Sequence, residues 1–164
     1  MKNNNSRICE EVSFAITYSA IEEVLMADSS YIARSLYDVA AEKSSVLPII
    51  ITADDSEFIL SRVLQACNHI ATNLVAYIAH DTQFAHEPYT FVLHLPVQRN
   101  VAIDALISHE LLRAIVAYVL AGWYELRLPD MASRQWQLYE AAIAMIRHDV
   151  FMAQGRVRRA CNYV

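Results

Sequence analysis

The sequence predicts a mainly α-helical protein, a compact bundle of about four to five helices with a minor β-hairpin or short strands. Three observations lead to this prediction. Apolar residues recur three and four positions apart over long segments, which is the spacing of one helix face. Two capping signals mark expected helix starts. The 164 residues include only two glycines and four prolines, so turns are few and the elements are long.

The N-terminal part is expected to hold a strand followed by a helix. Residues 1–10 are polar and are predicted to be disordered. Residues 11–18 alternate between apolar and polar side chains, as a half-buried strand does. Ser19 and Glu22 match the Ser-x-x-Glu capping box, so a helix should follow to about residue 26. The apolar face of the strand would contain Val12, Phe14, Ile16 and Tyr18.

The middle of the chain is expected to be helical on either side of an extended segment. A second helical piece is predicted near residues 30–42. The β-branched run at 47–52 suggests a short strand or an extended segment. Asp54 and Glu57 form the next capping signal and open a helix over roughly residues 55–79. Its buried stripe should include Phe58, Ile59, Val63, Ala66, Ile70 and Leu74.

A second strand and two long helices complete the prediction. Residues 82–88 are expected to form a loop, and residues 89–95 alternate, with Tyr89, Phe91, Leu93 and Leu95 on one face. Residues 102–127 form a helix that is apolar around most of its circumference and is closed by Pro129. Asp130 can cap a last helix to about residue 152, which Gly155 stops. Inward positions of that helix are Trp136, Ile143, Ile146 and Val150.

Composition indicates one domain with surplus apolar surface. We expect a single helical domain at residues 11–152 and a basic docking tail at 153–164. Apolar residues make up 55% of the chain, which favours buried interfaces with other chains. The net charge of −5 argues against a main role in gripping DNA phosphates. Three scattered cysteines indicate reduced thiols, and no apolar stretch free of charge is long enough to predict a membrane span.

No pattern in the sequence predicts a catalytic site, a metal site or a cofactor. His109 and Glu110 begin the motif HELLR, but Arg113 stands where a zinc-protease helix has its second histidine. The Asp54–Asp55 pair is explained by a capped helix start. Cys67 lies among apolar neighbours and is interpreted as a small core residue. The sequence therefore predicts a protein that is not an enzyme.

Aromatic and basic residues near two helix ends are the candidate interface residues. Trp123 is also predicted to lie on the buried side of the long helix, together with Val119. Arginine and tyrosine are enriched at binding hot spots, which favours a docking role for the tail. The alternative that the basic tail contacts nucleic acid stays open. The candidates are Trp123, Tyr124, Arg156, Arg158, Arg159 and Tyr163.

Two segments resemble the head–tail connector (adaptor or neck) proteins of long-tailed bacteriophages. The first, ITADDSEFILSRVLQACNHIATNLVAYI, is similar to their opening helix, which follows a short extended segment and a pair of acids. The second, LLRAIVAYVLAGWYELR, is similar to a later helix that often ends in Trp-Tyr and a charged residue, here Trp123, Tyr124 and Glu125. The resemblance covers about residues 47–128, and the first 46 residues and the last helix depart from it.

The resemblance implies a structural part of a virion, assembled in the bacterial host cytoplasm. Such proteins form a ring between the portal and the tail, so the implied partners are other copies of the chain and neighbouring neck or portal proteins. DNA passes through the ring without specific binding, and no membrane is involved. Two other classes stay open: a small helical ligand-binding or enzymatic bundle with a pocket between helices, and an antitoxin-like interaction adaptor.

Overall fold

The computed structural model describes residues 9–37, 49–79 and 82–153 and confirms a mainly helical fold with a minor two-stranded β element. A single hydrophobic core contains residues from every helix and both strands. In chain order the elements are β1 (Cys9–Ile16), α1 (Tyr18–Tyr37), the 3₁₀ turn η3 (Ala53–Asp55), α2 (Ser56–Asn73), β2 (Tyr89–Pro96), α3 (Ala102–Tyr124) and α4 (Pro129–Ala153).

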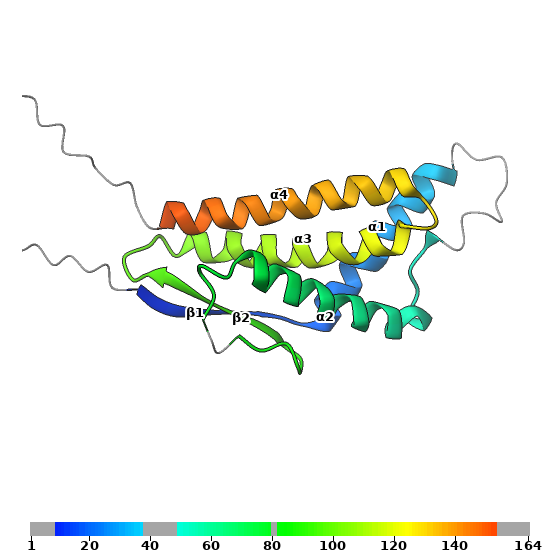
Figure 1. Ribbon diagram of the computed structural model, residues 1–164. Helices are drawn as coiled ribbons and strands as arrows, with labels where there is room; N and C mark the ends of the chain where they lie inside the picture. The colour runs from blue at the N-terminus through cyan, green and yellow to red at the C-terminus, as the bar shows by residue number, and fades with distance from the viewer. Residues whose placement is uncertain (1–8, 38–48, 80–81, 154–164) are drawn as a thin grey trace, which may run out of the picture.

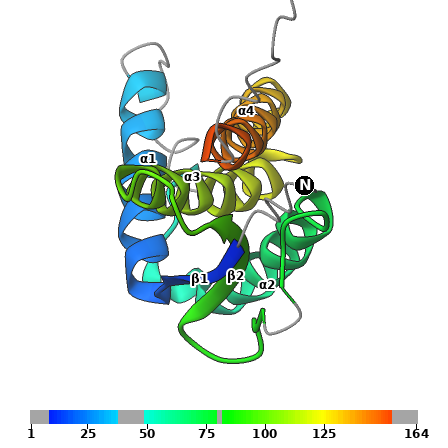
Figure 2. The same cartoon turned by 90° about the vertical axis from the view of Figure 1, so that its left-hand side faces the viewer.

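Helix α3 is the centre of the fold. It runs antiparallel to α4 (Figure 1), and the end-on view shows α1, α2 and α4 placed around it (Figure 2). Twelve of its side chains are buried, among them Leu111, Ile115 and Leu120. By length and composition α3 is apolar enough to cross a membrane, and half of that stretch is buried inside the protein. Its apolar circumference follows from having neighbours on several sides.

The two strands form an antiparallel sheet although some seventy residues separate them in the chain. Phe14 pairs with Phe91, and Ile16 pairs with Tyr89. The alternation predicted for residues 89–95 is confirmed, because Tyr89, Phe91, Leu93 and Leu95 are all buried. On the other edge of β2, the Ala79 N–H donates to the Val92 carbonyl at 2.8 Å. Alternation predicts that a strand exists but not which strand it pairs with.

The predicted boundaries of the first strand and helix were wrong. Cys9 and Glu10 belong to β1 rather than to a disordered N-terminus. Tyr18 is the first residue of α1 and not the end of the strand. The helix start is capped by Thr17, whose Oγ1 accepts the Ala20 N–H at 3.3 Å, so Ser19 is not the cap. Threonine and serine are both good N-caps, and the local pattern did not separate them.

Helix α1 is continuous, whereas two separate helical pieces were predicted. Ser29 lies where the two predicted pieces would separate, and it is fully buried. Its hydroxyl donates to the Met26 carbonyl at 3.3 Å and accepts the Ile51 N–H at 3.2 Å. Because both of these hydrogen bonds satisfy its hydroxyl group, the buried serine is tolerated inside the helix. The remainder of the predicted second piece, residues 38–42, lies outside the described residues.

The predicted cap and end of α2 were also wrong, although its buried stripe is confirmed. Helix α2 begins at Ser56 with Asp55 at its N-cap position, and Asp55 makes no side-chain cap hydrogen bond there. The Asp55 carboxylate instead belongs to the capping box of η3 and accepts both the Thr52 N–H and the Thr52 hydroxyl at 2.9 Å. The helix ends at Asn73, because Ile78 and Ala79 pair with β2 instead. The described part of the 47–52 run forms no regular strand. Of the six stripe residues, Phe58 is half-buried. The other five are fully buried: Ile59, Val63, Ala66, Ile70 and Leu74.

The course of α4 follows the prediction, but its predicted start and the predicted end of α3 were wrong. Helix α3 ends at Tyr124, three residues early. Pro129 is the first residue of α4, a position where its missing N–H costs nothing, so Asp130 lies inside the helix and is not its cap. Helix α4 reaches Ala153, one residue into the predicted tail. Ile143, Ile146 and Val150 are buried as expected, and Trp136 is half-buried.

Candidate interaction groove

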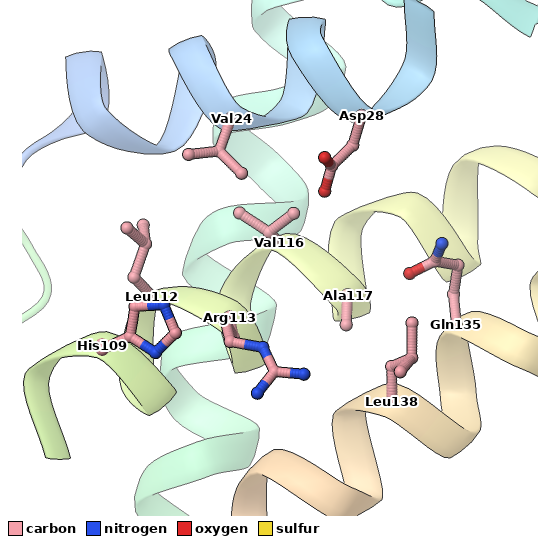
Figure 3. Close-up of a pocket in the computed structure, with 9 residues that line it drawn as sticks. All are labelled: Val24, Asp28, His109, Leu112, Arg113, Val116, Ala117, Gln135 and Leu138. Atoms are coloured by element: carbon pink, nitrogen blue, oxygen red, sulfur yellow. The ribbon is translucent and has the colours of Figure 1, made fainter. Parts of the chain in front are cut away.

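An open groove runs over α3 between helices α1 and α4. One hollow of about 260 Å³ lies where the three helices meet, with side chains from all of them pointing toward it (Figure 3). A second hollow of about 390 Å³ adjoins it at the junction of β1 and α1, and both share His109 and Leu112. The first hollow is lined by Val24, Asp28, His109, Leu112, Arg113, Val116, Ala117, Gln135 and Leu138.

The floor of the groove is the middle of α3, from His109 to Ala117. Most residues after 113 are buried, whereas on the N-terminal side residues 102, 105, 106, 109 and 113 are exposed. These positions are three and four apart and share one face of the helix. Leu106 on this face is 54% exposed. The same helix therefore provides the centre of the core at one end and an uncovered apolar surface at the other.

Helix α4 adds a stripe of exposed apolar residues to one wall. Leu138, Met145 and Met152 are seven residues apart and are 39%, 46% and 46% exposed. A seven-residue repeat places them along one line of the helix, as in the seam of a helix–helix interface. Leu138 also lines the first hollow, so the stripe and the groove form one surface. We call Leu106, Leu138, Met145 and Met152 the apolar rim.

The opposite wall is acidic. Asp28 on α1 faces the groove, and burial raises the pKa of its carboxyl above the ordinary value of 3.8. Within residues 9–37, 49–79 and 82–153, Asp28 forms no ion pair. A carboxylate without a partner makes a cation at this surface favourable.

The basic groups on the floor of the groove are already occupied. Arg113 Nη1 donates to both carboxylate oxygens of Glu110, at 2.9 and 3.1 Å. His109 Nδ1 also lies 3.5 Å from a Glu110 oxygen. The HELLR segment thus forms a local charge cluster on α3. Among the residues that the structure describes, no three His, Cys, Asp or Glu side chains are grouped to hold a metal ion.

A buried hydroxyl lies close to the acidic wall. Tyr124 is fully buried, and its hydroxyl oxygen has no hydrogen-bond partner in the described part of the chain. Burial, and secondarily the charge of Asp28, raise the pKa of Tyr124 above its ordinary value of 10.0. The combined arrangement is an apolar groove with an acidic wall, and it is suited to an amphipathic segment that carries cations.

The aromatic residues predicted as interface candidates are placed in the core. The indole N–H of Trp123 donates to the Ile49 carbonyl at 2.8 Å, and its ring meets Phe58 edge-on at 5.2 Å. Trp123 is 5% exposed, and the predicted burial of Trp123 and Val119 is confirmed. The packing inside one chain already accounts for Trp123 and Tyr124. Their role in an interface between chains stays a prediction.

The other interface candidates lie outside the described residues, and a second aromatic cluster was not predicted. The candidates outside are Arg156, Arg158, Arg159 and Tyr163. The cluster joins α2, α3 and α4. The Tyr139 ring meets Tyr118 edge-on at 5.6 Å and Trp136 edge-on at 5.9 Å, and its hydroxyl hydrogen-bonds to His69 Nδ1 at 2.7 Å. The only sequence signal was the inward position assigned to Trp136.

The fold and this groove define a helical protein with an uncovered surface suited to binding another helix or chain segment. No protein-family model, no curated protein and no solved structure matches the chain.

Proposed function

We propose that the protein is a non-enzymatic subunit of a phage or prophage neck, which assembles into a ring that joins the portal to the tail. The observation that carries this proposal is the apolar rim beside the α1–α3–α4 groove, which one chain leaves uncovered. Interfaces of obligate oligomers resemble a domain core cut in half, and the exposed side chains of the apolar rim would supply the apolar part of such an interface.

The resemblance to connector proteins supports the same proposal. Its two segments fall on α2 and α3, two helices that pack against each other in this fold. The net charge of −5 suits a ring through which DNA passes, because an acidic lumen repels phosphates. The partners are then other copies of the chain and neighbouring portal or tail proteins.

Assembly of the full-length protein tests this function. We expect light scattering after size exclusion to give a large oligomer, alone or on addition of the portal protein, and electron microscopy to show rings. Met145→Glu should prevent assembly while leaving the helical circular dichroism spectrum unchanged. Leu60→Glu is the matched control, because Leu60 on α2 is 44% exposed and Met145 is 46% exposed.

Two results would contradict the proposal. If the protein stays monomeric at every concentration and does not assemble with portal or tail proteins, the proposed ring is refuted. Normal assembly of Met145→Glu would show that the apolar rim is not the interface. A monomer that binds a small molecule in the groove would instead favour the ligand-binding alternative.

A further inference from the structure

We propose that the groove between α1, α3 and α4 is filled by the C-terminal residues 154–164 of a neighbouring copy of the same chain. This inference rests on the proposed ring, and it names the segment that joins one subunit to the next. The groove needs an occupant with an apolar side for its floor and a cation for Asp28. The C-terminal sequence has both features.

The pattern of the segment matches the chemistry of the groove. Val157, Ala160, Cys161 and Val164 are spaced by three, one and three residues, which places them on one face of a helix. Arg156, Arg158 and Arg159 fall on the other faces of such a helix, and no acidic residue occurs in the segment. These arginines are complementary in charge to the unpaired Asp28 carboxylate. An eight-residue helix is too short to be stable alone, so it would depend on packing in a groove.

The position of the arginines favours a neighbouring copy over the same chain. Helix α4 ends at Ala153, and Leu138, which lines the hollow together with Asp28, lies about 22 Å back along its axis at 1.5 Å per residue. Arg156, Arg158 and Arg159 follow Ala153 by only three to six residues, so a helix that folds back at Gly155 would keep them near this end of α4 and far from Asp28. A segment from a second copy is not tied to this end of α4 and can place its arginines beside Asp28, and repeated head-to-tail docking can close a ring.

The native cysteines offer a direct test. Cys161 lies within the proposed segment, whereas Cys67 is fully buried, and burial raises the pKa of its thiol to about 12, so it stays unreactive. In a full-length Cys9→Ser background, Leu138→Cys places a thiol in the groove. Leu64→Cys is the matched control, because Leu64 on α2 is 38% exposed, Leu138 is 39% exposed, and Leu64 lines neither hollow.

Mild oxidation followed by non-reducing electrophoresis should give a ladder of disulfide-linked oligomers for Leu138→Cys. Its cross-linked fraction should exceed that of Leu64→Cys by at least about tenfold, because docking raises the effective concentration of the two thiols. Adding Cys161→Ser should abolish the ladder. Asp28→Asn should lower the cross-linking rate by about two- to fivefold, the size expected for a partly exposed ion pair.

Four other outcomes would contradict the inference, and each would contradict a different part of it. A fast-migrating monomer with an internal disulfide would place the segment in its own groove. Rings that form without a Cys161-dependent ladder would refute the docking segment and leave the proposed function standing. A protein that neither assembles nor cross-links would refute both. An Asp28→Asn ladder formed at the parent rate would refute the ionic contact.

Discussion

Replacing Trp123 by alanine should destabilise the protein more than any surface substitution. The side chain joins three parts of the chain: it belongs to α3, packs against Phe58 of α2, and donates its indole N–H to the Ile49 carbonyl at 2.8 Å. It is 5% exposed, and Ile49 is 7% exposed. Truncation therefore creates a cavity and leaves a nearly buried carbonyl without its donor.

The magnitude follows from these two losses. Removal of a buried tryptophan side chain costs about 3–5 kcal/mol of unfolding free energy through lost burial and the cavity. The orphaned Ile49 carbonyl adds about 1 kcal/mol, at the lower end of the usual range because the groups can relax toward water. Trp123→Phe keeps most of the apolar contact and loses the N–H donor, so we expect a cost of only about 1–2 kcal/mol.

Urea unfolding followed by circular dichroism measures both variants against the parent at one protein concentration. The midpoint of Trp123→Ala should fall strongly with an unchanged slope, and its melting temperature should drop by about 8–24 °C. A loss below about 0.5 kcal/mol would refute the core assignment of Trp123. Equal losses for alanine and phenylalanine would show that the hydrogen bond, and not the packing, dominates.

Three further substitutions and one truncation test the structure. Gly122→Ala should stabilise the protein by about 0.5–1 kcal/mol in thermal unfolding, because the added Cβ meets only the flexible end of Arg62 at 3.0 Å; a loss of stability would show that Arg62 cannot move. Tyr139→Phe should cost about 1–2 kcal/mol through its bonds to His69 and Asn73, and unchanged urea midpoints would contradict this. Because the pKa of Asp28 is raised in the folded state, its protonated carboxyl favours folding, and this contribution is lost as the pH rises through the folded-state pKa. The unfolding free energy of Asp28→Asn should therefore increase relative to that of the parent between acid and neutral pH. A difference in unfolding free energy that does not change with pH would contradict this prediction. Deleting residues 154–164 should leave the melting temperature nearly unchanged and abolish assembly, and an unfolded product would place the segment in the core.

Periodicity predicted the helices well where the buried face was continuous. The stripe of α2 and the inward residues of α4 could be read from spacing alone, because each helix presents one apolar line to a common core. Boundaries were less predictable. The continuation of α1 through Ser29 depends on the Ile51 N–H, which is 22 residues away in the chain. The early end of α2 depends on pairing between Ala79 and Val92. Neither partner is visible in a local window.

The candidate groove could not be predicted from the sequence, because the residues that line it are also far apart in the chain. Asp28, Arg113 and Leu138 come from three helices, and nothing in their local patterns indicates that they meet. The sequence did indicate surplus apolar surface, but it pointed to Trp123 and Tyr124, which the fold buries. Aromatic residues satisfy the composition of a core and of an interface equally well.

Residue spacing along the chain was enough to predict the helical class and the apolar faces of the helices. Which apolar residues are covered became visible only in the fold. Helix α3 is mostly buried after residue 113 and borders the hollow between α1 and α4 at its middle, and Leu138, Met145 and Met152 remain exposed along α4. Burial depends on what other elements place against a surface, and that is a property of packing in three dimensions rather than of the local pattern.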